Sequence, residues 1–157
     1  GASAVLAVCS ARNLAALLRE LRPAAPGLRV YSSSWGFGPE LMDMAGSAAE
    51  GVVSCLPYPM DNVLPEVDKF NTRYIQRFGY PPSYAAALGY EAVRVAARAL
   101  ERNRGDRDGL GKVLAGLGRV PGVTGDIVMD SFGDVERPLF CTQCRRGRFV
   151  TLEESGD

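Results

Sequence analysis

The beginning of the chain alternates apolar runs with amphipathic segments. Residues 4–9 are uninterrupted apolar positions, typical of a buried parallel strand covered on both faces. After Ser10, which can cap a helix, one helical stripe carries Leu14, Leu17, Leu18 and Leu21. These residues predict a helix that ends near Pro23. The chain therefore opens with a strand followed by a helix that packs on it.

The same alternation continues to about residue 58. Shorter apolar runs at 28–31 and 52–55 predict two more strands, and a short helix is expected over 40–45 between them. Strands that alternate with helices form parallel sheets through right-handed crossovers. The pattern predicts an α/β fold, a parallel sheet with helices.

Beyond the prolines at 57 and 59 the pattern becomes mainly helical. Three helices are predicted, over residues 67–78, 83–102 and 108–117. Gly79 suits the position just after the first of these, and Ser83 can cap the second. Strands are then predicted at 127–129 and 138–144, around a turn at 131–134, and residues 148–150 end the ordered part.

Composition narrows the function classes. The 157 residues are 46% hydrophobic, and 18 basic residues balance 18 acidic ones. That balance gives no electrostatic reason to expect nucleic acid as a partner. The chain has no histidine, which removes the commonest general base and metal ligand. We therefore expect no enzyme, no catalytic residue, no metal and no cofactor.

The four cysteines offer the remaining candidate chemistry. Cys141 and Cys144 are three residues apart in a predicted strand, so their side chains should point to opposite faces. Cys9 and Cys55 stand alone in the sequence, and no second closely spaced pair completes a zinc site. We expect small packed side chains here. A disulfide between Cys141 and Cys144 is left open for an oxidising compartment.

Five short stretches follow one another along nearly the whole chain. They are AGSAAEG at 45–51, FGYP at 78–81, ALGYEA at 87–92, GVTGD to DSFGD over 122–134, and RGRFV at 146–150. In this order and spacing they resemble the carboxy-terminal half of type I periplasmic substrate-binding proteins of the branched-chain amino-acid (Leu/Ile/Val) importer family. That resemblance implies three-layer α/β lobes, incomplete here, with a ligand held in the cleft between them.

The resemblance also implies a division of the chain. Residues 1–58 and 136–151 would belong to the second ligand-binding lobe, and residues 62–135, a helical segment and strand, to the first. Residues 152–157 are expected to form a flexible tail. Neither lobe would be complete. Three explanations stay open: a fragment, a half supplied by another chain or a second copy, or a compact unit of its own.

Site residues are expected where strands end. Ligands of open α/β sheets bind beyond the carboxyl ends of the strands. Those ends and the cleft side of one helix supply the predicted ligand-binding residues, which are Ser10, Ala11, Ser33, Ser34, Trp35, Tyr58 and Tyr84. Hydroxyls fix polar ligand groups and aromatic rings cover apolar ones. Helix capping by Ser10 and core packing by Trp35 or Tyr84 are the structural alternatives.

The resemblance implies the ligand class and the partners. Related binders of branched-chain amino acids carry a carboxylate after the second strand, where this chain has Ser34. The ligand classes considered are therefore an amino acid, an amide or an aromatic acid. The implied role is the periplasmic or extracellular solute-binding component of an ABC importer, which meets the importer's membrane subunits. Lipid anchoring of the full-length protein, and a sensory ligand-binding domain as the alternative function, stay open.

Overall fold

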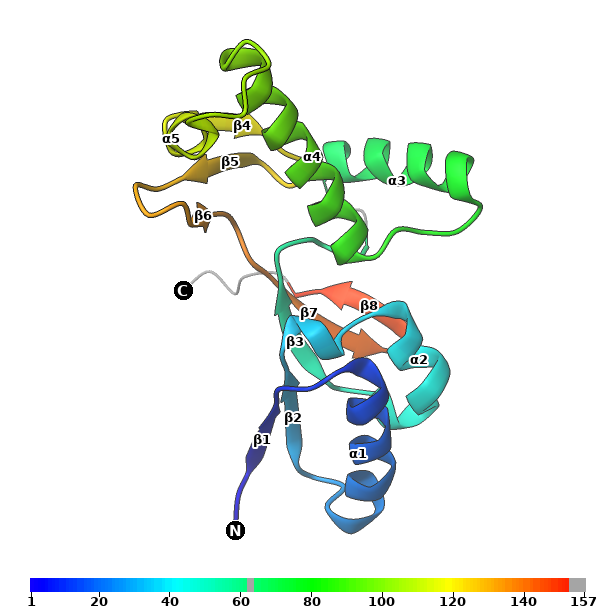
Figure 1. Ribbon diagram of the computed structural model, residues 1–157. Helices are drawn as coiled ribbons and strands as arrows, with labels where there is room; N and C mark the ends of the chain where they lie inside the picture. Colours follow the sequence, from blue (N-terminus) through cyan, green and yellow to red (C-terminus); the bar gives the residue numbers. More distant parts are fainter. Residues whose placement is uncertain (62–63, 153–157) are drawn as a thin grey trace. The chain divides into compact units, whose positions relative to one another are not determined.

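The computed structural model describes residues 1–61 and 64–152, which divide into two compact units (Figure 1). Unit 1 comprises residues 1–63 and 139–157, and unit 2 comprises residues 64–138. The chain therefore leaves unit 1 once and returns to it once. The assignment of these segments to the lobes of a binding protein stays a prediction. The tail expected to be flexible lies, from residue 153 onward, outside the described residues.

Unit 1 is built on a five-stranded sheet in the order β1-β2-β3-β7-β8. Its elements are β1 (Ala4–Ala7), α1 (Ala11–Ala24), β2 (Arg29–Ser32), the 3-10 turn η1 (Ser34–Gly36), α2 (Pro39–Ala45), the 3-10 turn η2 (Gly46–Ala49), β3 (Val53–Leu56), β7 (Phe140–Arg145) and β8 (Arg148–Thr151). The first three strands are parallel, whereas β7 and β8 form an antiparallel hairpin added beside β3. The predicted α/β class is confirmed, with the returning strands making the sheet mixed.

Helix α1 follows its sequence signals closely. The Ser10 hydroxyl accepts a hydrogen bond from the Asn13 amide at 3.4 Å, which confirms the predicted cap. Pro23 lies inside the last turn rather than beyond it, and the helix ends one residue later at Ala24. Arg22 then donates to the carbonyl oxygens of Leu28, Ala48 and Glu50, which ties the helix end to the next segments.

The two faces of this sheet differ. Helices α1 and α2 cover one face (Figure 1) and bury the apolar core. The core is formed by Ala7, Ala11, Leu14, Ala15, Leu18, Val30, Phe37, Leu41, Ala45, Ala49, Val52, Leu56 and Cys144. Leu6 and Val8 remain 66% and 72% exposed. Within the described part of unit 1, the strand predicted to need cover on both faces therefore has it on one.

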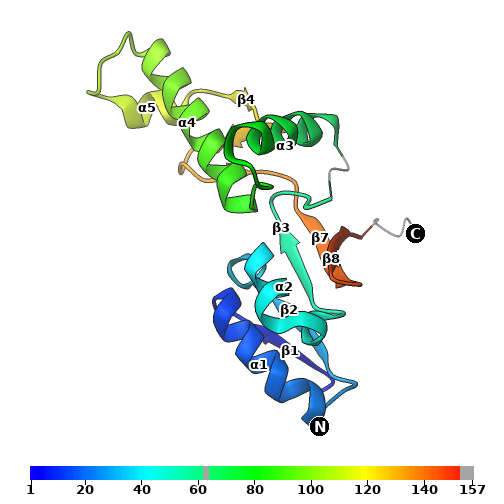
Figure 2. The same cartoon turned by 90° about the vertical axis from the view of Figure 1, so that its right-hand side faces the viewer.

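Unit 2 combines three helices with a small antiparallel sheet. Its elements are α3 (Pro65–Phe78), α4 (Tyr84–Arg102), α5 (Leu110–Ala115), β4 (Arg119–Pro121), β5 (Asp126–Met129) and β6 (Val135–Glu136), with the strands in the order β4-β5-β6. Helix α5 lies beside α4 in both Figure 1 and Figure 2. Strands β4 and β6 were not expected, because they are only three and two residues long.

Two predicted helix boundaries in unit 2 are confirmed, whereas α5 is shorter than the predicted 108–117. Gly79 adopts a φ of 80° and its amide donates to the Ile75 carbonyl, so it ends α3 in the left-handed region. The Ser83 hydroxyl accepts from the Ala86 amide at 3.3 Å and caps α4. In the described residues, no helix combines the length and the apolar character that crossing a bilayer requires.

Candidate ligand-binding site

The loops after β1 and β2 are packed together at the carboxyl edge of the unit 1 sheet. The Ser33 amide donates to the Ala7 carbonyl at 3.0 Å. A Cβ at Gly36 would lie 2.4 Å from the Ser32 hydroxyl and 3.0 Å from the Cys9 carbonyl oxygen. Only glycine fits that position without a shift of its neighbours. The loop after β2 is therefore held against the end of β1, which brings two of the predicted ligand-binding segments side by side.

Trp35 projects from this loop into solvent. Its side chain is 66% exposed, so it is not part of the unit 1 core. The loop is nevertheless fixed on both sides, by Ser33 as above and by Phe37, which is fully buried and packs on Phe149 with ring centroids 4.8 Å apart. An exposed tryptophan on an anchored loop offers a fixed aromatic surface to a ligand.

The hydroxyl groups near Trp35 are differently engaged. The Ser32 hydroxyl donates to the Ser33 carbonyl at 2.9 Å. The Ser33 hydroxyl is buried and has no hydrogen-bond partner among residues 1–61 and 64–152. Ser34 is partly exposed at the start of η1. Buried hydroxyls normally have partners, so the Ser33 hydroxyl has unused hydrogen-bonding capacity, which a ligand can meet only if the side chain turns outward.

The other predicted ligand-binding residues are Ser10, Ala11, Tyr58 and Tyr84, and they lie outside the loop after β2. Ser10 caps α1, and Ala11 is 4% exposed within the unit 1 core, next to this loop pair. Tyr58 follows β3 and is only 1% exposed, so it is not on the open surface of the described chain. Tyr84 is partly buried at the first position of α4 in unit 2. The structure thus gathers Ser10, Ala11, Ser33, Ser34 and Trp35 at one sheet edge.

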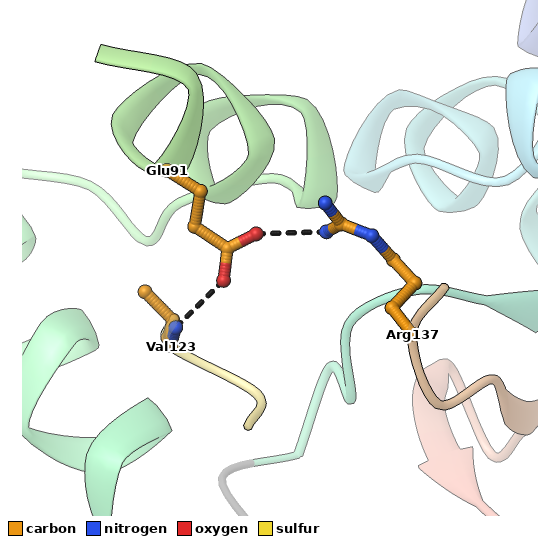
Figure 3. Close-up of polar contacts among 3 residues, drawn as sticks. All are labelled: Glu91, Val123 and Arg137. Carbon is orange, nitrogen blue, oxygen red and sulfur yellow. Dashed lines mark hydrogen bonds and ion pairs between the residues drawn. The ribbon is translucent and has the colours of Figure 1, made fainter. Parts of the chain in front are cut away.

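Unit 2 is organised around a buried carboxylate that the sequence analysis did not single out (Figure 3). Glu91 is 2% exposed, accepts a hydrogen bond from the Val123 amide at 2.6 Å, and pairs with Arg137 at 2.7 Å. A Cβ at Gly122 would lie 2.6 Å from a Glu91 carboxylate oxygen, so the contact requires glycine there. The stretches 87–92 and 122–134 therefore meet through this carboxylate. Arg137 immediately precedes Pro138, where the chain returns to unit 1.

A separate groove of about 330 Å³ lies between α3 and α4 in unit 2, and its lining contains none of the predicted site residues. Its aromatic lining residues contact one another, with Phe70 and Tyr90 centroids 5.2 Å apart and Tyr74 and Phe78 4.5 Å apart. Arg94 lies over the Tyr90 ring at 5.7 Å. The side chains that line the groove therefore contact one another and contribute to the packing of α3 against α4.

The cysteines confirm one expectation and correct another. Cys141 is exposed and Cys144 is 1% exposed, so their side chains do point to opposite faces of β7. Cys55 and Cys141, expected to be small packed side chains, are instead exposed, and they lie directly opposite each other on neighbouring strands with 2.7 Å between the two sulfur atoms. The pairing of β3 with β7 joins positions 86 residues apart, and no local pattern in the sequence predicts it.

Both thiol environments raise the pKa of their cysteines. The pKa of Cys55 rises to about 11 through its hydrogen bond with Cys141, and secondarily through burial and the neighbouring thiol's charge. Burial is the first cause that raises the pKa of Cys144 to about 12, and the Glu50 carboxylate adds to it. Both thiols are therefore protonated and weakly nucleophilic near neutral pH.

Comparison with solved structures gives fold matches that cover almost the whole chain. A leucine binding protein, LivK, from Thermotoga maritima matches with a TM-score of 0.86 and 24% identity, and a putative branched-chain amino acid ABC transporter from Rhodospirillum rubrum with 0.78 and 30%. A solute binding protein of an ABC transporter from R. palustris, in complex with benzoate, matches at 0.82 and 18%. Each match covers 96% of this chain but only 44%, 44% and 42% of the other.

The chain thus spans less than half the length of these proteins. Its α/β units and their order follow the same fold over that length. The family assignment rests on the sequence itself, because the match to the family runs from residue 1 to residue 148 and so includes both units. This chain belongs to the periplasmic binding protein family.

Proposed function

We propose that this chain supplies the carboxyl-edge half of the ligand site in the solute-binding component of an ABC importer. The observation that carries the proposal is the anchored loop after β2, with Trp35 exposed and the Ser33 hydroxyl unpaired, in a chain of the periplasmic binding protein family. A ligand in such a site gains ring contact from Trp35 and hydrogen bonds from the serines. Members of this family are substrate-binding proteins, and the proposed role is binding without chemistry.

The proposed ligand is an aromatic acid or an amide rather than an α-amino acid. The loop after β2 offers hydroxyl groups at Ser33 and Ser34, and residues 33–37 carry no carboxylate to meet an ammonium group; the next carboxylate, Glu40, lies against Gly38 at the start of α2. Binding an ammonium group away from water without a counter-charge is costly. The benzoate complex of the R. palustris protein shows that this fold accommodates an aromatic acid. The exposed indole of Trp35 offers a face on which an aromatic ligand can stack.

The proposal includes a location and partners. An importer's solute-binding component works in the periplasm or outside the cell and delivers its ligand to membrane subunits. Ligand sites of this kind enclose most of the ligand surface, and the carboxyl edge of unit 1 supplies only one wall. A second wall of α/β structure must close the site, so the described chain alone should bind small solutes only weakly.

Calorimetric titration of the longest natural polypeptide that contains this chain tests the proposal. The panel consists of benzoate, 4-hydroxybenzoate, benzamide, leucine and valine. We expect one aromatic acid or amide to bind, and Trp35→Ala to weaken it about 10- to 100-fold through loss of ring contact. Phe132→Ala is the matched control, because Phe132 is a 90% exposed aromatic residue in unit 2, outside the proposed site. An equal loss in both variants, or tight leucine binding that ignores Trp35, contradicts the proposal.

A further inference from the structure

The exposed pair formed by Cys55 and Cys141 is the best-defined reactive group that the proposed function does not use. The two residues lie directly opposite each other in the antiparallel pairing of β3 with β7, and their sulfur atoms are 2.7 Å apart. Opposite residues of an antiparallel pair have Cα atoms about 4.5–5.5 Å apart, which falls within the usual disulfide range. Both side chains are exposed and accessible to an oxidant. Neither thiol serves the apolar core, which instead contains Cys144.

We infer that Cys55 and Cys141 are a disulfide-forming site that covalently joins β3 to β7. The step is a thiol–disulfide exchange with a disulfide oxidant. One thiolate attacks the oxidant, forms a mixed disulfide and releases the first thiol. The second thiolate then attacks the mixed disulfide and releases the second thiol. Two protein thiols are oxidised to one disulfide, and one oxidant disulfide is reduced to two thiols.

The position of this bond gives it a structural consequence. Residues 55 and 141 lie on either side of the segment that forms unit 2, so the bond closes a loop that contains the whole of residues 64–138. The chain forms unit 2 before it returns to unit 1 as strand β7. The pairing of β7 with β3 joins the terminal hairpin to the parallel strands. A cross-link that closes a long loop stabilises chiefly by restricting the unfolded chain.

The other two cysteines provide internal comparisons. Cys144 is 1% exposed on the opposite face of the same strand, so an oxidant in solution does not reach it, whereas Cys55 and Cys141 are both exposed. Cys9 is partly buried in the loop after β1. An oxidant should therefore select the Cys55–Cys141 pair over Cys144, although Cys144 is closer in sequence to Cys141.

The test exposes the chain to glutathione disulfide at mildly alkaline pH and identifies the product by mass spectrometry without reduction. We expect a loss of two hydrogen atoms per chain, one cross-linked peptide that joins Cys55 to Cys141, and a Tm higher by roughly 5–15 °C than that of the reduced chain. Cys55→Ser and Cys141→Ser should each abolish all three changes. Cys9→Ser should keep them.

Three results would overturn the inference: a link between Cys141 and Cys144, a link between two chains, or no loss of hydrogen under conditions that oxidise a free dithiol. If a serine variant fails to fold, the peptide map of the unsubstituted chain still shows which two cysteines are linked. The outcome is independent of ligand binding, so it stands or falls separately from the proposed function.

Discussion

The interior of unit 1 differs in kind from the interior of unit 2. Unit 1 buries a continuous apolar core between its sheet and helices α1 and α2, including Leu14 and Leu18 at 0% exposure. Unit 2 also buries apolar side chains, among them Val67, Ala99 and Ile127, but adds a buried carboxylate, Glu91, bound to a backbone amide and to Arg137. Apolar packing is non-directional and tolerates small adjustments, whereas a buried ion pair needs both partners in place.

The Glu91 pair spans 46 residues and fixes Arg137 next to the point where the chain leaves unit 2. Replacing Arg137 leaves the buried Glu91 carboxylate without its counter-charge, and replacing Glu91 leaves the Val123 amide and the partly buried Arg137 without their acceptor. The comparison therefore predicts that unit 2 is the more sensitive to single polar substitutions, and unit 1 to apolar ones.

Among the substitutions considered, Glu91→Ala is expected to lower the free energy of unfolding the most. Removing the carboxylate leaves the Val123 amide and the Arg137 guanidinium without their partner, and it should lower the free energy of unfolding by about 3–5 kcal/mol. Hydrogen exchange should show the loss of protection first in residues 64–138. The double variant Glu91→Gln with Arg137→Met removes both charges and should cost less than Glu91→Ala alone.

The exposed pair between Arg98 and Glu101 is the matched control in the same unit. Its atoms are 3.7 Å apart and its side chains are 71% and 70% exposed, so Glu101→Ala should cost less than about 0.5 kcal/mol. Equal costs for Glu91→Ala and Glu101→Ala would show that the buried pair does not hold unit 2 together.

An apolar truncation in unit 1 should have a comparable or slightly smaller effect. Leu18→Ala empties a fully buried position in the core and should cost about 2–5 kcal/mol in urea denaturation. Leu17→Ala, one position along the same helix and 39% exposed, should cost less than half as much. If the two variants unfold at the same urea concentration, α1 does not pack as described.

Alkaline pH should weaken unit 1 through Cys144. Its pKa is raised from 9.0 to about 12, chiefly by burial, so the unfolded chain releases this proton at lower pH than the folded chain. The resulting stability is complete below about pH 9 and is lost as the pH rises from 9 towards 12. The slope is at most about 1.4 kcal/mol per pH unit.

Urea midpoints at several alkaline pH values check this expectation. Cys144→Ala should lose less stability with rising pH than the unsubstituted chain, because the other titrating groups are shared. Identical pH profiles for the two proteins would mean that the Cys144 thiol ionises as freely in the folded chain as in the unfolded one.

Much of the fold could be predicted because its signals are local. The Ser10 and Ser83 caps, the leucine stripe of α1 and the ending of α3 at Gly79 each depend on residues within one or two turns. These signals reflect capping and periodicity, which a single sequence displays directly.

The features that were missed depend on long-range pairing. Cys55 meets Cys141, and Glu91 meets Arg137, only because separate segments come together in the fold. The candidate ligand-binding site likewise has parts that local sequence predicts and parts that it does not. The loop with Ser33, Ser34 and Trp35 could be placed at a strand end, whereas the burial of Tyr58 depends on packing that no local pattern reveals.

The most direct test of the proposed binding role is an exchange of ligand preference at Ser34. Introducing Ser34→Asp into the longest natural polypeptide that contains this chain adds a carboxylate to the loop after β2. Calorimetric titration should then show aromatic-acid affinity reduced about 10- to 100-fold by charge repulsion, and leucine affinity raised by a similar factor through a charge-assisted hydrogen bond. Unchanged affinities for both ligands would contradict the account, because the loop after β2 would then not contact the ligand.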